Sequence, residues 1–330
     1  AVYDALSGHL IANSLLLNSG RVGLADLLRD QTTLEALNVE EENCHPFASD
    51  VFRGLAGLVP RYSLPRRQLW EFLEEPHRRD ALQMTANLES RYLDHDTIVA
   101  LTELLRKGEY NSKRLLRRLY STRSSVEHAL NADFLDSVFR TMSCATRDLY
   151  WTEWVRENSN WLLDDLRRLE SGWQERRGPR TTVDKLRSKW VLWLLTSTVR
   201  KLRDYATRAL YWFGRGEPAA LFLLAEKALE VNDPYVFERV LAASYGVAMA
   251  IHADPVYTEL SSTELRDHAR NIFDLLFKGD ARFTTTHEAI RDYARSICEL
   301  AVIHNQSLFS ATELSRIHKP GDSVGAEVWQ

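Results

Sequence analysis

Glycine and proline are scarce in this chain of 330 residues, which contains fourteen glycines and nine prolines. A collagen-like protein needs glycine at every third position, and a protein built from many short strands needs frequent glycine-rich turns. The first class is therefore excluded and the second is disfavoured. What is abundant is leucine, at about one residue in seven, together with far more arginine than lysine. This composition favours long amphipathic helices.

Cysteine is also rare, and long apolar runs are missing. Cys44, Cys144 and Cys298 are too few and too widely spaced for a disulfide framework, so we expect a reducing, cytoplasmic compartment. No apolar run approaches the ~20 residues of a membrane helix, so we expect no membrane partner. The formal net charge of -4 excludes a chain that is basic throughout. Because Ala1 stands in place of a start methionine, we expect a fragment of a longer protein.

The sequence lacks the common catalytic motifs. No Gly-Lys pair is present for a phosphate-binding loop, and neither a His-Glu-x-x-His motif nor a Gly-x-Ser-x-Gly elbow occurs. The string Asp94, His95, Asp96 is the best metal-like pattern, but we interpret it as a helix start in which an aspartate is the N-cap. The sequence therefore predicts a non-enzymatic chain that carries no cofactor and no metal.

Helix start and stop signals are clearest in the second half of the chain. Thr181 with Asp184 predicts a capping box, Asp233 before Pro234 predicts an N-cap, and Gly214 predicts a left-handed C-terminal cap. Ser261 with Glu264, and Thr285 with Glu288, predict two further helix starts. Residues 4–37 predict two or three helices with a break at Gly20 and Gly23, and residues 39–65 are expected to be the least regular part. These signals divide the chain into regions 1–60, 61–178, 181–305 and 306–330, the last a short helix and tail.

A short pattern of an apolar residue, Arg, Asp, an aromatic or His residue, and Ala occurs three times. It is present at 202–206, 265–269 and 290–294, and a weaker copy lies at 236–240. Stacked helical hairpins use an apolar anchor and a small residue where neighbouring helices approach. Because the spacings are uneven, we predict an all-α fold, an irregular HEAT-like α-solenoid of antiparallel helical hairpins.

Two stretches are strongly basic. Residues 106–123 contain seven Lys or Arg against one acid, and residues 176–208 contain ten against two. Around 113–119, Lys113, Arg114, Arg117 and Arg118 fall opposite a leucine face. We favour solvated helix faces paired with acids from neighbouring helices; the alternative is a phosphate-binding surface for nucleic acid.

Tryptophan is concentrated in one segment, with six of the nine between Trp151 and Trp193. Helical spacing favours a core role, and the alternative is an aromatic contact surface. On that alternative, the candidate partner surface comprises Arg114, Arg117, Arg118, Trp151 and Trp154.

Several separated blocks resemble a known family. In sequence order the blocks are Ser7, His9, Leu10, Ile11 and Ala12; Asn131, Ala132, Asp133 and Leu135; Arg147, Asp148, Trp151 and Trp154; Leu195, Thr196, Ser197, Arg200, Leu202, Arg203, Asp204, Ala206, Thr207, Ala209 and Leu210; Asn232, Asp233, Pro234, Tyr235, Val236, Glu238 and Arg239; and Tyr245 and Gly246. Their order and spacing resemble the helical region that follows the ATPase core in large bacterial NACHT-like STAND NTPases of anti-phage defence, the AVAST type. The resemblance extends from about Tyr3 to His304.

The resemblance implies a function. Members of this family carry an effector, a central ATPase and helical repeats that recognise a phage protein and permit oligomerisation. This chain would be the helical scaffold or sensor, region 1–60 would follow the ATPase core, and its partners would be a phage protein or other parts of the parent ATPase. The alternative function is a nucleic-acid-binding α-solenoid.

The polar residues of the two strongest blocks are candidate site residues, which we interpret as structural rather than as a binding site. We expect Asp233 to cap a helix, and Arg203 or Arg239 to pair with Asp204 or Glu238 between neighbouring helices. We expect this pair to be partly shielded from water, so that losing one partner costs more than the ~1 kcal/mol of an exposed pair. The full set is Arg203, Asp204, Asn232, Asp233, Tyr235, Glu238 and Arg239.

Overall fold

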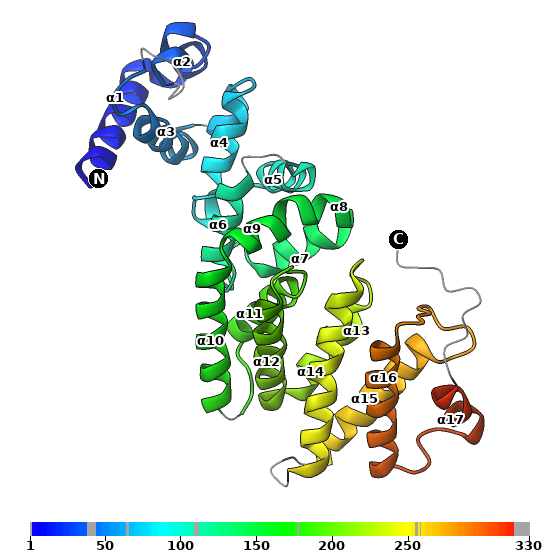
Figure 1. Cartoon of the computed structure of the whole chain (residues 1–330). Coiled ribbons are helices and arrows are strands. Elements are labelled where there is room, and N and C mark those ends of the chain that lie inside the picture. Colours follow the sequence, from blue (N-terminus) through cyan, green and yellow to red (C-terminus); the bar gives the residue numbers. More distant parts are fainter. Residues whose placement is uncertain are drawn as a thin grey trace. The chain divides into compact units, whose positions relative to one another are not determined.

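Every regular element that the structure describes is a helix. The computed structural model describes residues 2–37, 44–63, 66–108, 112–176, 178–254, 257 and 259–319, and these ranges contain no strand (Figure 1). The predicted all-α fold is confirmed.

The chain divides into two compact units. Unit 1 comprises Ala1–Thr122 and Glu127–Leu130, and unit 2 comprises Arg123–Val126 and Asn131–Gln330. This division lies inside the region expected at 61–178, and the border expected at residue 60 falls within a helix, Ala48–Tyr62. The predicted tail beyond residue 319 lies outside the described residues.

Unit 1 is built around α3, which packs against α1, α2 and α4. Its helices are α1 (Val2–Leu27), α2 (Gln31–Leu37), α3 (Ala48–Tyr62), η1 (Leu69–Phe72), α4 (His77–Thr85), η2 (Ser90–Tyr92), α5 (His95–Lys107) and α6 (Ser112–Thr122). Asp94 caps α5 by accepting a hydrogen bond from the Thr97 amide at 2.8 Å, as the sequence predicted. In α6, the leucine face is buried and Lys113, Arg114 and Arg117 are exposed, which confirms the predicted amphipathic pattern.

Two expectations for unit 1 are wrong. Helix α1 continues without a break past Gly20 and Gly23, and α3 covers most of the stretch that was expected to be irregular. Two other glycines of unit 1, Gly8 and Gly54, permit close packing of helices instead of turning the chain. A Cβ on Gly54 would lie 2.9 Å from the Ala12 Cβ, and a Cβ on Gly8 would lie 2.4 Å from the Asp50 Cβ, so both glycines let α1 and α3 approach.

Unit 2 is a stack of helical hairpins. Its helices are α7 (Ala132–Thr141), α8 (Cys144–Arg147), the π-helical turn η3 (Asp148–Thr152), α9 (Glu153–Glu157), α10 (Ser159–Glu175), α11 (Thr182–Leu194), α12 (Arg200–Gly216), α13 (Pro218–Ala228), α14 (Pro234–Ala253), α15 (Glu259–Leu276), α16 (Glu288–His304) and α17 (Ala311–His318). Helices α10, α12, α14 and α16 form one row, each packed against the next, and α11, α13 and α15 each pair with the helix that follows (Figure 1). This two-layered arrangement is an all-α solenoid-like fold.

The repeated pattern is buried on α12, α15 and α16, although α15 lies outside the row that contains α12 and α16. Its apolar anchors are at most 1% exposed and its alanines are fully buried; they are Leu202, Leu265 and Ile290, and Ala206, Ala269 and Ala294. The pattern therefore reflects the packing of neighbouring helices, as predicted.

The predicted caps are only partly confirmed. Thr181 and Asp184 form a capping box at the start of α11. Gly214 does not end α12; it is buried inside the helix, where a Cβ would lie 2.3 Å from Leu221 Cδ2. Ser261 lies within α15, which begins at Glu259.

The start predicted from Thr285 is also displaced. Helix α16 begins at Glu288, and the Thr285 hydroxyl accepts a hydrogen bond from the His287 amide in the preceding turn.

Within the described ranges, no helix combines the length and apolar character needed to cross a bilayer.

Candidate functional site

The tryptophan-rich segment forms the core of unit 2. The Trp151 ring stacks on Trp154 with centroids 5.6 Å apart and meets Trp190 edge-on at 5.2 Å. Trp151 Nε1 donates hydrogen bonds to the Trp193 carbonyl and to Thr196 Oγ1, both at 3.0 Å. Trp151 and Trp154 are each 1% exposed. The contact-surface alternative is therefore wrong for these two residues.

The π-helical turn η3 has one side in the core and the other side at the surface. Trp151 and Thr152 face inward, whereas Asp148 and Leu149 are exposed. Thr152 Oγ1 donates to Asp148 Oδ1 at 2.9 Å, and the Cys144 thiol donates to Asp148 Oδ2 at 3.5 Å. Single π turns within helices are frequent at functional sites because they redirect side chains.

Directly before this turn, Arg147 is completely buried. Its Nη2 donates to the Asn232 carbonyl at 3.1 Å and forms an ion pair with Asp233 Oδ2 at 3.3 Å. Its guanidinium also lies over the Trp193 ring, 5.6 Å from the centroid. Because a buried charge needs an opposite charge and hydrogen bonds, Arg147 joins η3 to the start of α14.

Asp233 serves two structural roles. Its Oδ1 accepts a hydrogen bond from the Tyr235 amide at 3.0 Å, which caps α14 and confirms the predicted N-cap, while Oδ2 accepts from Arg147. Burial raises the pKa of the Asp233 carboxyl, while Arg147 and the Tyr235 amide act in the opposite direction.

Beside this pair lies a cavity of about 420 Å³. It is lined by Cys144, Asp148, Thr152, Glu153, Arg156, Leu195, Thr196, Ser197, Thr198, Arg203, Asp233, Pro234 and Tyr235. Arg203 Nη1 donates to the Ser197 carbonyl at 2.6 Å, and its guanidinium lies 5.5 Å from the centroid of the Tyr235 ring. The Tyr235 side chain is 56% exposed at the rim. Arg203, Asp233 and Tyr235 are thus the candidate residues that the structure brings together in one cavity.

The remaining candidate residues of the two blocks lie outside the cavity lining. Arg239 Nη1 pairs with Asp204 Oδ1 at 2.8 Å and Arg239 Nε with Glu238 Oε1 at 3.7 Å, so the predicted pairing between α12 and α14 is confirmed. Asn232 contributes its carbonyl to Arg147.

We expect Asp204→Ala to have only a small effect. The Asp204 side chain is 44% exposed, so solvent screens its pair with Arg239, and the loss in free energy of unfolding should stay below about 1 kcal/mol. This is less than we expected for a pair shielded from water. Chemical denaturation of the variant beside the parent measures the difference, and a loss several times larger would contradict the exposed-pair interpretation.

The three arginines of the candidate surface belong to unit 1 and differ in their contacts. Arg118 Nε donates to the Ala86 carbonyl at 2.9 Å and Nη2 to the Asn87 carbonyl at 3.3 Å, so it covers the end of α4, and burial lowers the pKa of its guanidinium. Arg114 and Arg117 are exposed on α6. Arg118 is therefore a structural residue, and the other two remain surface candidates.

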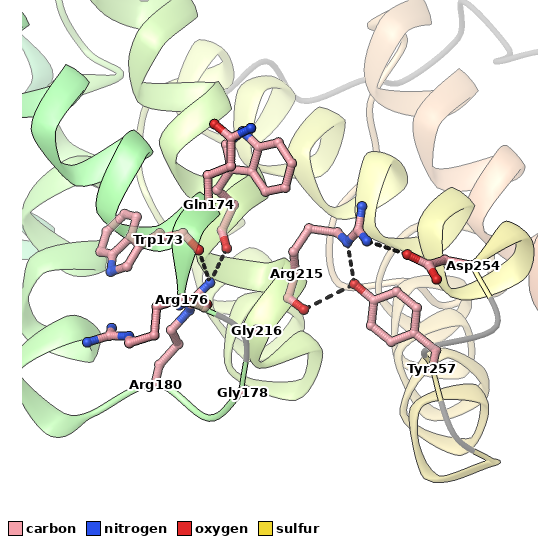
Figure 2. Close-up of a pocket in the computed structure, with 10 residues that line it drawn as sticks. Trp173, Gln174, Arg176, Gly178, Arg180, Arg215, Gly216, Asp254 and Tyr257 are labelled. Atoms are coloured by element: carbon pink, nitrogen blue, oxygen red, sulfur yellow. Dashed lines mark hydrogen bonds and ion pairs between the residues drawn. The ribbon is translucent and has the colours of Figure 1, made fainter.

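A second cavity, of about 280 Å³, lies at the carboxyl ends of α10 and α12 (Figure 2). The buried Arg180 donates from Nε to the Phe213 carbonyl, from Nη1 to the Arg176 carbonyl and from Nη2 to the Trp173 carbonyl, each at 2.9 Å. The last carbonyls of a helix have no partner within the helix and carry partial negative charge. Arg180 therefore joins the carboxyl ends of α10 and α12 through hydrogen bonds.

Arg215 makes a similar set of hydrogen bonds and an ion pair in the same cavity. Its Nε donates to the Tyr257 hydroxyl and its Nη2 pairs with Asp254, both at 2.6 Å, while the Tyr257 hydroxyl donates back to the Arg215 carbonyl (Figure 2). Burial raises the pKa of Tyr257, with Arg215 acting against it. Because these donors are occupied by the protein itself, we interpret this cavity as structural.

Sequence reasoning missed the roles of Arg147, Arg180 and Arg215. Arg147 was part of a family-like block, yet nothing in its local sequence distinguishes a buried arginine from an exposed one. The structure's described part contains no group of three or more His, Cys, Asp or Glu side chains arranged to hold a metal ion. Comparison with known proteins finds no match among protein-family models, curated proteins or solved structures.

Proposed function

We propose that this chain is the helical scaffold or sensor module of a STAND-type ATPase in cytoplasmic bacterial antiviral defence, coupling recognition of a phage protein to oligomerisation of the ATPase. The proposal starts from the family resemblance. One observation supports it: blocks that lie far apart in the sequence contact one another through Arg147, Trp151, Thr196 and Asp233. These four residues come from three of the blocks and contact one another in pairs within unit 2.

In this proposal the chain contributes binding and mechanical coupling, and ATP hydrolysis belongs to another part of the parent protein. The α-solenoid offers a series of helix ends and loops that a partner protein contacts. At the cavity beside Arg147, Tyr235 and Arg203 lie together at the surface. Tyrosine and arginine are the residue types that most often dominate protein interfaces. We assign the contact with the phage protein to this rim, which replaces the structural role that the sequence predicted for Tyr235 and Arg203.

The test is binding of individually purified phage proteins to the chain and to two variants. Tyr235→Ala should weaken binding about 30-fold, the effect of losing ~2 kcal/mol at an interface hot spot. Met249→Ala, at another exposed apolar position of the same helix, should leave affinity unchanged. Calorimetric titration gives both dissociation constants.

Two results would count against the proposal. If no protein of phages that trigger defence binds the chain, the sensor role fails. If Tyr235→Ala and Met249→Ala behave alike toward a bound phage protein, the assignment of the cavity rim fails. The coding sequence upstream tests the parent class, because a Walker phosphate-binding motif is expected there in the same reading frame.

A further inference from the structure

The two Arg-rich stretches differ in how their charges are neutralised. In the stretch 176–208, carboxylates from other helices or loops meet the cations: Lys185 pairs with Glu217 at 2.6 Å and Arg208 with Glu170 at 2.5 Å. Arg176 pairs with Asp184, and Lys189 with Asp133. Acids from other elements therefore neutralise four of the ten cations of this stretch: Arg176, Lys185, Lys189 and Arg208.

Helix α6 follows the opposite pattern. It contains no acidic residue, and Arg114 and Arg117 form no ion pair or hydrogen bond through their side chains with any residue that the structure describes. At 100° per residue, Lys113, Arg114 and Arg117 fall within one third of the helix circumference. The opposite side, formed by Leu115, Leu116 and Leu119, is at most 1% exposed. The basic face of α6, defined by Lys113, Arg114 and Arg117, therefore points to solvent.

This arrangement is unfavourable for the helix itself. Lys113 and Arg117 are four positions apart and Arg114 and Arg117 are three apart, so like charges are neighbours on the surface. Elsewhere in the chain, several exposed arginines have an aspartate three positions away, as in the pairs Arg53–Asp50, Arg167–Asp164 and Arg295–Asp292. A bound polyanion would remove the repulsion that the basic face of α6 otherwise carries.

We propose that the basic face of α6 binds the phosphate backbone of nucleic acid. Guanidinium groups match phosphate oxygens in a two-point geometry. A protein partner would need an apolar centre to its interface, yet none of the large exposed apolar side chains in the described ranges lies on α6. A surface that offers only charge suits contacts to the backbone, which carry no sequence information. Since the chain as a whole has a net charge of -4, this binding is local and sensitive to salt.

The experiment measures fluorescence anisotropy of a labelled 20-base-pair duplex and of a labelled oligo(dT) of 20 nucleotides, titrated with the whole chain. Two phosphate contacts, by Arg114 and Arg117, predict a slope of about -1.8 for log affinity against log salt on the duplex. Arg114→Gln with Arg117→Gln should reduce this slope to near zero and lower affinity at least tenfold at ~0.1 M salt. Arg114→Glu with Arg117→Glu should abolish binding.

The matched control is Arg200→Glu with Lys201→Glu, which changes the net charge by the same amount on exposed positions of the other Arg-rich stretch. It should bind as the parent does. The glutamine pair keeps much of the length of the side chains, and its circular dichroism melting curve should match that of the parent.

Three outcomes would overturn the proposal: no binding of either probe by the parent at ~50 mM salt, an equal loss in the control, or displacement of the probes by polyglutamate as readily as by unlabelled duplex. The last would assign the face to an acidic protein. None of these outcomes bears on the contact at Tyr235.

Discussion

Arg147→Met should lower the free energy of unfolding by about 3–5 kcal/mol, because removing one member of a buried ion pair leaves the other charge without a partner. Arg147 is completely buried, and its partner Asp233 is 8% exposed. Methionine fills much of the space of the arginine side chain, so most of the loss reflects the stranded carboxylate. Chemical denaturation followed by tryptophan fluorescence measures it.

A second substitution separates charge from packing. Asp233→Asn preserves an acceptor for the Tyr235 amide and removes the negative charge. The double variant Arg147→Met with Asp233→Asn should therefore recover part of the stability that Arg147→Met loses. If the two losses simply add, the ion pair makes no contribution of its own and the interpretation of Arg147 fails.

The loss should also depend on pH. Burial raises the pKa of Asp233 above its ordinary value of 3.8, and Arg147 opposes that shift. Without Arg147 the pKa rises further, and below it the carboxyl is neutral and carries no stranded charge. The destabilisation by Arg147→Met should therefore be smaller near pH 4.5 than near pH 7.5. A loss that does not change over this range would contradict the assignment.

Local features of the fold could be predicted because their causes are local. The cap of α11 depends on Thr181 and Asp184, which are three positions apart, and the face of α6 depends on residues within two turns. Gly214 was misinterpreted as a helix end because the same residue type both turns a chain and admits a close neighbour. Which role applies depends on a helix elsewhere in the sequence.

The candidate site was only partly predictable for the same reason. Asp233 and Arg239 were identified, but Arg147 lies 86 positions before Asp233, and the contact between them joins the end of α8 to the start of α14. The four helix-end carbonyls that surround Arg180 belong to two helices, α10 and α12. Such contacts depend on tertiary structure and leave no mark in the local sequence.

The core role of the tryptophans was predicted from their helical spacing, and one substitution tests it for Trp151. Trp151→Ala should lower the free energy of unfolding by about 3–5 kcal/mol, since it removes a large buried ring and leaves a cavity. The ring contacts Trp154, Trp190 and Phe139, and its Nε1 satisfies the Trp193 carbonyl. Trp151→Phe keeps part of the packing and should cost less, because it loses mainly the hydrogen bonds of Nε1.

Leu149→Ala is the matched control for Trp151→Ala, because Leu149 lies on the same π-helical turn but is 64% exposed. Truncating it removes no buried contact, so its free energy of unfolding should stay within about 0.5 kcal/mol of the parent. Melting curves and denaturant titrations of the two variants beside the parent give the comparison. Equal stability of Trp151→Ala and Leu149→Ala would mean that Trp151 does not support the core. A large loss confined to Trp151→Ala would establish that the inward-facing ring of Trp151 supports the core of unit 2, where it packs against Trp190 of α11.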